Sequence, residues 1–151
     1  MSVAIRAAGP ADEGRCQTLL ELLSKGAYTP TAFHETFTRL LDQSRGRIVV
    51  ADEDGFLLGM ATVSYNLALR YDGEYCQLEE LIVDPVARGK NVGGLLVQQT
   101  IADARSRGCG EYGLYLVERT EHNRPFYEKY GLEAVGTEMR MPLGQSKGTD
   151  A

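Results

Sequence analysis

The stretch from residue 77 to residue 96 constrains this chain most, because its pattern predicts a strand, a tight loop and a helix in succession. A short apolar run ends near Pro85, which has no N–H group to donate to a sheet ladder; its members are Leu78, Leu81, Ile82 and Val83. Residues 88–94 then supply three glycines, and apolar residues recur at helical spacing from Leu95. The stretch therefore predicts a strand–loop–helix unit.

The loop of this unit has the properties of an anion site. The first turn of a helix leaves its N–H groups without internal partners, and the helix dipole favours negative charge there. Glycines let the backbone approach a ligand closely, and Asn91 tolerates a positive φ. Positive charge and small residues thus indicate a pyrophosphate ligand for the set Arg88, Gly89, Lys90, Asn91, Val92, Gly93 and Gly94. An ordinary strand–helix connection is the alternative interpretation.

The same residues resemble the acetyl-CoA signature of the GNAT acetyltransferase superfamily, Arg/Gln-x-x-Gly-x-Gly/Ala. Val83-Asp84-Pro85 is followed by Arg88-Gly89-Lys90-x-x-Gly93, with Asn91 in place of the usual first glycine. Downstream, Phe126-Tyr127-Glu128-Lys129-x-Gly131-Leu132 is similar to the family's Phe/Leu-Tyr-Glu-Lys-x-Gly-Phe motif. Two motifs in the family's order make the resemblance cover nearly the whole chain.

The periodicity along the chain predicts an α+β fold, and the resemblance implies that it is the GNAT fold. Its sheet would be mixed and mostly antiparallel, within a single domain at residues 1–144 and with a flexible tail at 145–151. The expected order is strand 3–6, helices from Asp12 to Gly26 and from Thr29 to Leu41, strands 46–51, 56–65 and 76–83, helix 95–106, strand 114–117, helix 124–131 and strand 133–141.

Composition limits the partners and the compartment. A net charge of −5 disfavours nucleic acid, and no apolar run approaches the length of about 20 residues that a membrane span needs. No secretory leader is visible. The sparse, odd set Cys16, Cys76 and Cys109 suggests reduced thiols and a cytoplasmic location.

Acetyl transfer to a primary amine needs a base, because an alkyl ammonium group has a pKa near ~10 and must lose a proton before it attacks a thioester. Glu79 and Glu80 lie on the predicted strand beside the loop. Adjacent strand residues face opposite ways, so one of the two is expected to point into the cleft. The resemblance to polyamine-type members favours Glu79, with Glu80 as the alternative; both could also be solvated or ion-paired.

The resemblance also implies the remaining site residues. Tyr127 takes the position of the phenol that protonates the departing CoA thiolate, although it could instead be a packing tyrosine. The strands near 77–83 and 114–118 would splay apart, and a bulge in the first would free backbone groups of Leu81 and Val83 for the pantetheine arm. Thr120 stands where the family often has a CoA-contacting Asn, and Asn123 could substitute. Acetyl-CoA is then the cosubstrate, and no metal is expected.

Two other motif matches fail on context. Residues 108–113 satisfy the spacing GxGxxG, but they follow a helix and precede a strand, whereas a dinucleotide fingerprint follows a strand and opens a helix. A Walker A motif at Gly89-Lys90 fails because Asp84 replaces its first glycine and Asn91 its Ser/Thr.

The predicted function is therefore acetyl-CoA-dependent N-acetylation of a primary amine by direct attack in a ternary complex. The alternative is a non-catalytic acyl-CoA-binding sensor or regulatory module, which would keep the phosphate loop and lose the acid and base. The acceptor could be a small amine or a protein amine, and a homodimer is common among such folds. Tyr28, Phe33 and Phe37 could line the acceptor pocket, although aromatic residues at helical spacing are more often core.

Overall fold

The computed structural model describes residues 2–23 and 28–144 of the chain. The expected helix end at Gly26 and the expected tail at 145–151 lie outside the described residues. The elements, in chain order, are β1 (Ala4–Ala7), α1 (Glu13–Leu23), α2 (Pro30–Leu41), β2 (Gly46–Glu53), β3 (Phe56–Ala68), β4 (Gly73–Val83), α3 (Val92–Arg107), β5 (Tyr112–Leu114) and α4 (Arg124–Glu128).

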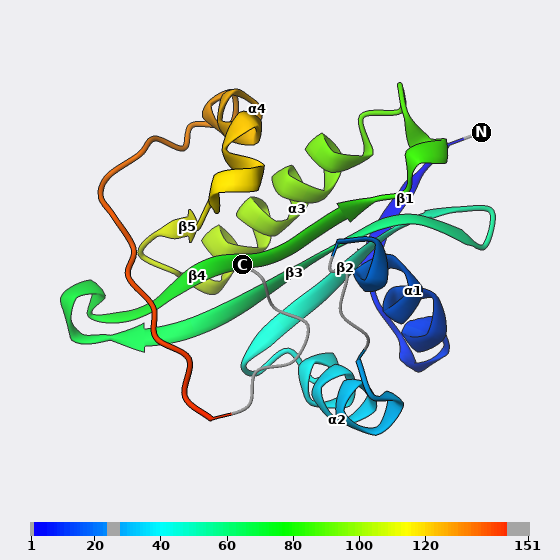
Figure 1. The fold of residues 1–151 in the computed structure, drawn as a ribbon, viewed down its shortest axis with the longest axis horizontal. Helices are drawn as coiled ribbons and strands as arrows, with labels where there is room; N and C mark the ends of the chain where they lie inside the picture. The colour runs from blue at the N-terminus through cyan, green and yellow to red at the C-terminus, as the bar shows by residue number, and fades with distance from the viewer. Residues whose placement is uncertain (1, 24–27, 145–151) are drawn as a thin grey trace.

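The strands form one mixed sheet in the order β1-β2-β3-β4-β5. The first four strands pair antiparallel, and β5 joins β4 parallel, after the crossover through α3. Helices α1 and α2 cover one face of the sheet, and α3 with α4 covers the other (Figure 1). The predicted α+β class and the mostly antiparallel, mixed sheet are confirmed.

Local chemistry explains most element boundaries. The β2–β3 hairpin turns at Asp54 and Gly55, whose φ values of 52° and 90° suit these two residue types. Thr29 is the N-cap of α2, and its hydroxyl accepts the Ala32 N–H at 3.3 Å. Gly108, with φ of 89°, ends α3 in the left-handed conformation that glycine adopts readily.

The expected final strand at 133–141 is wrong, since the structure has no strand there. This segment continues from α4 as an irregular chain (Figure 1), and Val135, Met139 and Met141 are 87%, 91% and 76% exposed. Its alternating pattern suits a strand, but a strand also needs a neighbour to pair with. The expected strand at 114–117 is also displaced, because β5 ends at Leu114, where its pairing with β4 stops.

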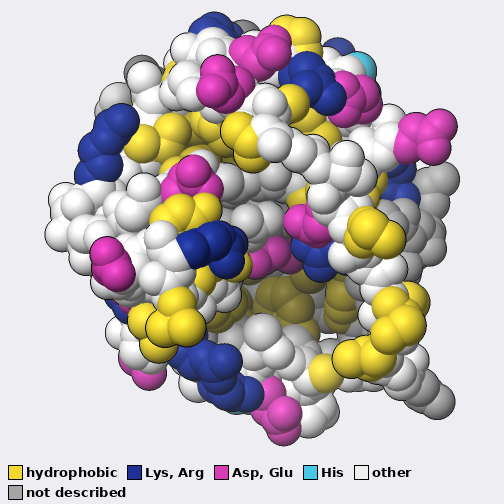
Figure 2. Space-filling model, turned by 90° about the vertical axis from the view of Figure 1, so that its left-hand side faces the viewer, with side chains coloured by type: hydrophobic (Ala, Val, Ile, Leu, Met, Phe, Trp, Pro, Cys, Tyr) yellow, Lys and Arg dark blue, Asp and Glu magenta, His cyan; other side chains and the backbone are white. Residues whose placement is uncertain are grey.

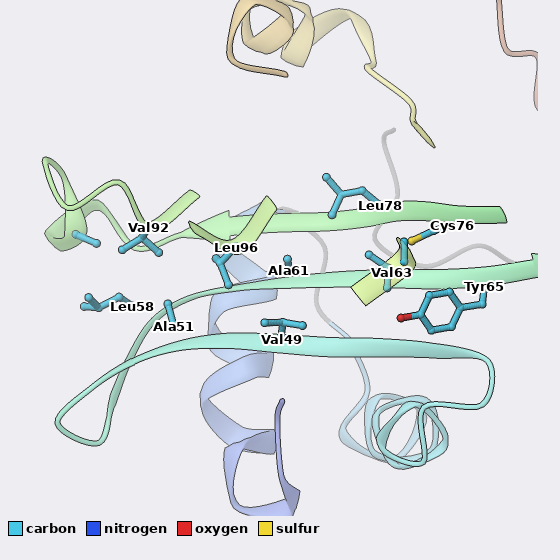
Figure 3. Packing of buried hydrophobic residues seen from close by; sticks show 12 residues of the cluster. Val49, Ala51, Leu58, Ala61, Val63, Tyr65, Cys76, Leu78, Val92 and Leu96 are labelled. Carbon is cyan, nitrogen blue, oxygen red and sulfur yellow. The ribbon is translucent and has the colours of Figure 1, made fainter. Parts of the chain in front are cut away.

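Two hydrophobic clusters bury the two faces of the sheet. On the α3 face, Leu96 packs against inward side chains of β2 and β3, including Val49, Ala61 and Val63 (Figure 3). The opposite face packs α1 and α2 against the intervening residues, among them Cys16, Leu19, Phe37, Val50 and Met60. Successive residues of β2 therefore alternate between two covered faces, which explains why its apolar run is nearly continuous.

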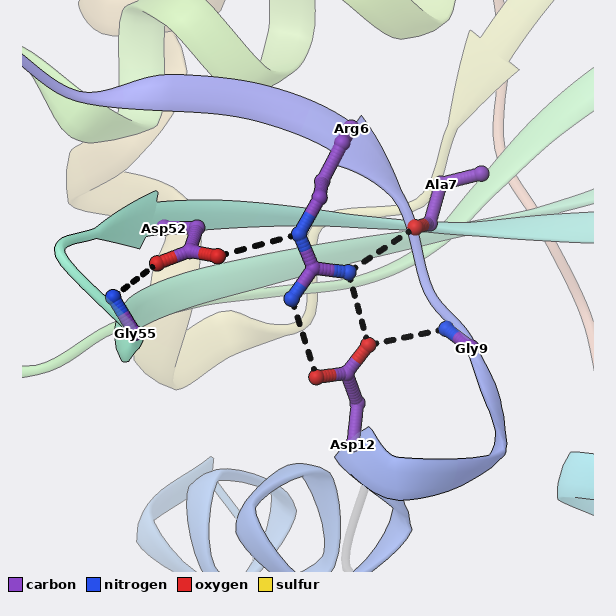
Figure 4. Close-up of polar contacts among 6 residues, drawn as sticks. All are labelled: Arg6, Ala7, Gly9, Asp12, Asp52 and Gly55. Atoms are coloured by element: carbon purple, nitrogen blue, oxygen red, sulfur yellow. Dashed lines mark hydrogen bonds and ion pairs between the residues drawn. The ribbon is translucent and has the colours of Figure 1, made fainter.

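Arg6 of β1 connects three segments through its guanidinium group (Figure 4). It donates to both carboxylate oxygens of Asp12, at 2.8 and 3.0 Å, and to Asp52 Oδ2 at 3.0 Å. The N–H groups of Gly9 and Gly55 donate to these same two carboxylates. The sequence predicts Asp12 as a helix N-cap, but its carboxylate serves this network, and the guanidinium holds its pKa below the usual range.

We expect Asp12→Asn to lower the free energy of unfolding at pH 7 by about 1 kcal/mol, a figure discounted for solvent screening because Arg6 is 40% exposed. A lowered folded-state pKa stabilises the fold above the unfolded pKa, and this contribution is lost as pH falls through the folded pKa. The difference from wild type in urea unfolding should therefore shrink in acid. Asp54→Asn, at an exposed turn carboxylate, is the matched control, and an equal loss there would contradict the prediction.

Candidate active site

The site begins where β4 loses its neighbour. Strands β4 and β5 pair only from Cys76 to Leu78 on β4 and from Tyr112 to Leu114 on β5. Beyond Leu78, β4 continues to Val83 with β3 on one side and no β5 partner on the other. The expected splaying of these two strands is confirmed, and it leaves one edge of residues 79–83 open.

A β-bulge lies at the start of this open edge. Thr62 of β3 pairs with Glu80, whereas the next residue, Val63, pairs with Leu78, so Glu79 is the extra residue of β4. Ser64 Oγ donates to Glu79 Oε2 at 2.6 Å, and Thr62 Oγ1 donates to Glu80 Oε1. Because Thr62 and Ser64 lie two residues apart on β3, both carboxylates project from the same face. The expectation that only one of the two glutamates faces the site is corrected by this bulge.

The two carboxylates have different surroundings. Glu79 is exposed, whereas Glu80 is half-buried and its own N–H donates to Thr62 Oγ1 at 3.1 Å. Burial raises the pKa of Glu80, the Thr62 hydroxyl opposes this shift, and the negative charge of Glu79 adds to it. Glu80 therefore binds a proton more tightly than an ordinary glutamate.

A cavity of about 370 Å³ opens between the sheet and the helices α1 and α2. Glu80 and Thr62 line it, and Glu80 carries the only charge among the described lining residues. The other described lining residues are mostly apolar: Cys16, Leu20, Tyr28, Thr29, Ala32, Phe33, Thr36, Phe37, Leu40, Ile48 and Met60. Tyr28, Phe33 and Phe37 all line the cavity. The two phenylalanines also pack in the hydrophobic cluster beneath α1 and α2. In a space-filling view, one face of the molecule is hollowed near its centre, with acidic, basic and hydrophobic side chains in and around the hollow (Figure 2).

Backbone groups of the open edge point away from β3. Asp84 donates its N–H to the Leu58 carbonyl at 2.8 Å, so the backbone of Asp84 faces β3. Backbone direction alternates along a strand, and the N–H and C=O groups of Val83 and Leu81 therefore face the open edge. An extended ligand could pair with them there, as an added strand would.

The loop after β4 leaves the N-terminus of α3 uncapped by side chains. Asn91 and Gly89 adopt positive φ, at 56° and 83°, and no side chain caps the first turn of α3. The first-turn N–H groups remain available to an anion. Arg88 is exposed beside them, whereas Lys90 is paired with both carboxylate oxygens of Glu53 at 2.9 and 3.1 Å.

The glycines of this loop also have a packing role. A Cβ on Gly94 would lie 2.2 Å from the Tyr130 hydroxyl oxygen and 2.4 Å from Asn91 Oδ1. A Cβ on Gly93 would lie 3.5 Å from the Phe126 ring, which is ordinary contact. Helix α4 and the residues after it therefore rest on the start of α3, and Tyr130 is a packing tyrosine.

Tyr127 of α4 lies on the opposite side of the sheet from the two glutamates. It packs half-buried against the cluster on the α3 face, and burial raises its pKa, so the phenol keeps its proton at neutral pH. Asn123 is half-buried at the end of the 3₁₀ turn Glu118–Asn123, directly before α4. Thr120 donates its hydroxyl to the Val117 carbonyl at 3.1 Å, inside the same turn.

Two contributors escape sequence reasoning. Thr62 and Ser64 hold the two glutamate carboxylates, yet they are ordinary strand residues until the register with β4 is known. The sequence does favour Tyr130 over Tyr127 as a packing tyrosine, and the contact with Gly94 agrees with this. Within residues 2–23 and 28–144, no cluster of three or more His, Cys, Asp or Glu side chains could hold a metal ion. None of the helices in that part of the chain has the length and apolar character needed to cross a membrane.

Comparison with known proteins agrees with this geometry. Residues 16–132 match the family model described as the acetyltransferase (GNAT) family. The chain is 26% identical over 138 residues to a glucosamine 6-phosphate N-acetyltransferase of Trypanosoma brucei brucei, covering 87% of this chain and 92% of that protein. Its fold is similar to that of a transcriptional regulator from Bacillus halodurans C-125, with a TM-score of 0.85, 24% identity and coverage of 94% and 100%. It is also similar to AAC(6')-Iy in complex with a CoA-based bisubstrate analog, with a TM-score of 0.82, 18% identity and coverage of 95% and 99%.

The open strand edge and the uncapped helix N-terminus agree with the family that these comparisons indicate. The chain belongs to the GNAT family of acetyltransferases. It is accordingly an N-acetyltransferase, and the catalytic interpretation is favoured over a non-catalytic acyl-CoA-binding module.

We expect Gly94→Ala to destabilise the fold by about 1–3 kcal/mol, because the new methyl group would force Tyr130 away from α3. Gly14→Ala in α1 is the matched control: no atom lies within 4 Å of its Cβ position, so the change should be neutral or stabilising by up to about 1 kcal/mol. Thermal unfolding of both variants measures the difference. A harmless Gly94→Ala would show that this glycine has no packing role.

Proposed function

We propose that this protein transfers the acetyl group of acetyl-CoA directly to a small primary amine within a ternary complex. The observation that carries the proposal is the bulge at Glu79, which puts two carboxylates beside the open edge of β4 while Tyr127 lies on the opposite face. The acceptor can therefore reach the thioester from the α1–α2 side while the leaving sulfur faces α4.

Residues of the β4–α3 segment would bind the cosubstrate. The first-turn N–H groups of Val92, Gly93 and Gly94 receive the pyrophosphate, and Gly89 and Asn91 give the loop its shape. Arg88 adds charge from its exposed position, and Lys90 could do so after release from Glu53. The backbones of Leu81 and Val83 would pair with the pantetheine amides, and Asn123 is the candidate for a further contact near α4.

Glu80 is our candidate for the base, although the resemblance favours Glu79. Glu80 lines the cavity, and its raised pKa brings it closer to the pH at which the enzyme works. Exposed Glu79 would attract the incoming ammonium ion and could act through a water molecule. The base takes one proton from the ammonium group, and the freed nitrogen lone pair then attacks the thioester carbonyl carbon.

Collapse of the tetrahedral intermediate breaks the C–S bond and leaves the electron pair on sulfur. Tyr127 would donate its phenolic proton to this thiolate. The nitrogen must lose a second proton to become the neutral amide, and this proton passes through solvent to restore the phenol, while Glu80 releases its own proton to solvent. No enzyme-bound acetyl group is needed. Cys16 lines the cavity, but burial raises the pKa of its thiol to about 12, which makes it a poor nucleophile at neutral pH.

We also propose a cytoplasmic location and a homodimeric state for this protein. The free cysteines Cys16, Cys76 and Cys109 are consistent with a reducing compartment such as the cytoplasm. The exposed apolar side chains of residues 135–143 favour a homodimer, which light scattering coupled to size-exclusion chromatography would detect.

We expect Arg88→Gln to weaken acetyl-CoA binding by roughly 3- to 10-fold in calorimetric titration, because it removes a cation from the N-terminus of α3. Arg105→Gln, an exposed arginine in the last turn of the same helix, removes the same charge far from the loop and should leave the affinity unchanged. Equal effects of the two substitutions would indicate a general charge effect and argue against this phosphate site.

We expect Glu80→Gln to lower kcat by about 10²- to 10⁴-fold, with acetyl-CoA affinity retained. Since the base must be deprotonated and its pKa is raised, wild-type kcat/KM should increase with pH through a limb above the ordinary glutamate range. This limb should persist in Glu79→Gln and vanish in Glu80→Gln; the reverse result would make Glu79 the base.

Tyr127→Phe should lower kcat through the chemical step, and an unchanged kcat would exclude its role as acid.

A further inference from the structure

We propose that the acceptor is a monoamine with an apolar body, either a short alkyl chain or one aromatic ring, bound in the α1–α2 cavity with its ammonium group toward Glu80. This inference rests on the proposed function and specifies the substrate class of the same site. Four observations carry it: the apolar character of the cavity lining, the negative charge of Glu80, the absence of cations among the described lining residues, and the volume of the cavity.

The cavity walls are mostly hydrocarbon. Phe33 and Phe37 stack with ring centroids 5.8 Å apart and planes inclined by 22°, and Leu20 and Leu40 extend this surface. Ile48 and Met60 of the sheet face them from β2 and β3. A sugar or a second ammonium group placed here would lose water without gaining enough hydrogen bonds, whereas a ring or alkyl chain gains from burial.

The charges at the cavity suit a single cation. Glu80 lines the cavity and Glu79 projects from the same face of β4, so an ammonium ion is attracted to this part of the sheet. No Lys or Arg belongs to the described part of the lining. Among the described lining residues, a phosphate group would therefore meet the Glu80 carboxylate and no cation. This differs from what the name of the Trypanosoma brucei brucei relative says of its own substrate.

The size of the cavity agrees with a small body. A volume of about 370 Å³ lies at the lower end of the range of roughly 300–1,000 Å³ typical of small-molecule sites. Ala32 and Thr36 of α2 are exposed lining residues and thus lie at the mouth. A ring or short chain fits between this mouth and Glu80.

The first test compares acceptors at fixed acetyl-CoA, with CoA release as the readout. The panel contains 2-phenylethylamine, hexylamine, spermidine and glucosamine 6-phosphate. We expect kcat/KM for the two apolar monoamines to exceed that for the other two by at least 10-fold. A preference for glucosamine 6-phosphate or spermidine would overturn this inference and leave the proposed acetyltransferase function intact.

The second test uses a matched pair of variants on α2. Ala32→Phe puts a ring into the cavity mouth, and we expect it to lower kcat/KM for 2-phenylethylamine by at least 10-fold without changing acetyl-CoA affinity. Thr38→Phe adds the same ring at an exposed position of the same helix that does not line the cavity, and it should keep the wild-type values. Equal losses in both variants would overturn the placement of the acceptor.

A binding measurement separates this inference from the proposed function. Saturation-transfer NMR detects 2-phenylethylamine bound to the CoA-loaded protein whether or not it is acetylated. If no amine on the panel is acetylated, the proposed function fails; a transfer signal that is lost in Ala32→Phe and kept in Thr38→Phe would still support the cavity as an apolar amine site. No signal in wild type would overturn it.

Discussion

The site depends on a change of pairing along β4, which has a strand on each side at first and then only β3 on one side. From Cys76 to Leu78, β4 pairs with both β3 and β5; from Glu79 onward, it pairs with β3 alone. A backbone edge with unpaired groups is normally a liability, because it attracts any extended chain. In the function that we propose, the same edge would give an extended cosubstrate a place to pair, and the bulge beside it would turn the carboxylates toward the acceptor.

In the mechanism that we propose, the sheet would divide the reaction between its two faces. Glu79 and Glu80 contact Ser64 and Thr62 on the α1–α2 side, whereas Tyr127 packs into the cluster on the α3 side. Because Tyr127 and Glu80 lie on opposite faces of the sheet, the phenol cannot pass its proton directly to the carboxylate, as it could if the two groups were in contact. Burial raises the pKa of both Glu80 and Tyr127. The pKa of the carboxylate is therefore nearer to neutral pH, and the phenol keeps its proton there.

Sequence reasoning recovers the order of elements because hydrophobic period and turn residues act locally. The hairpin at Asp54 and Gly55, the left-handed Asn91 and the end of α3 at Gly108 all follow from the conformational preferences of single residues. The strand expected at 133–141 fails for the opposite reason, since pairing requires a neighbour that the pattern itself does not supply. The expectation that only one of Glu79 and Glu80 faces the site fails likewise, because a bulge is a property of two strands in register.

The ion pair between Lys90 and Glu53 connects the loop at residues 88–94, where we propose that the pyrophosphate binds, to the end of β2. Added salt would screen the attraction between a pyrophosphate and the loop, and the same salt would loosen Lys90 from its carboxylate. Ionic strength thus acts on this loop in two opposing directions. The dependence of acetyl-CoA affinity on salt would therefore be shallower than the number of cations near the loop suggests.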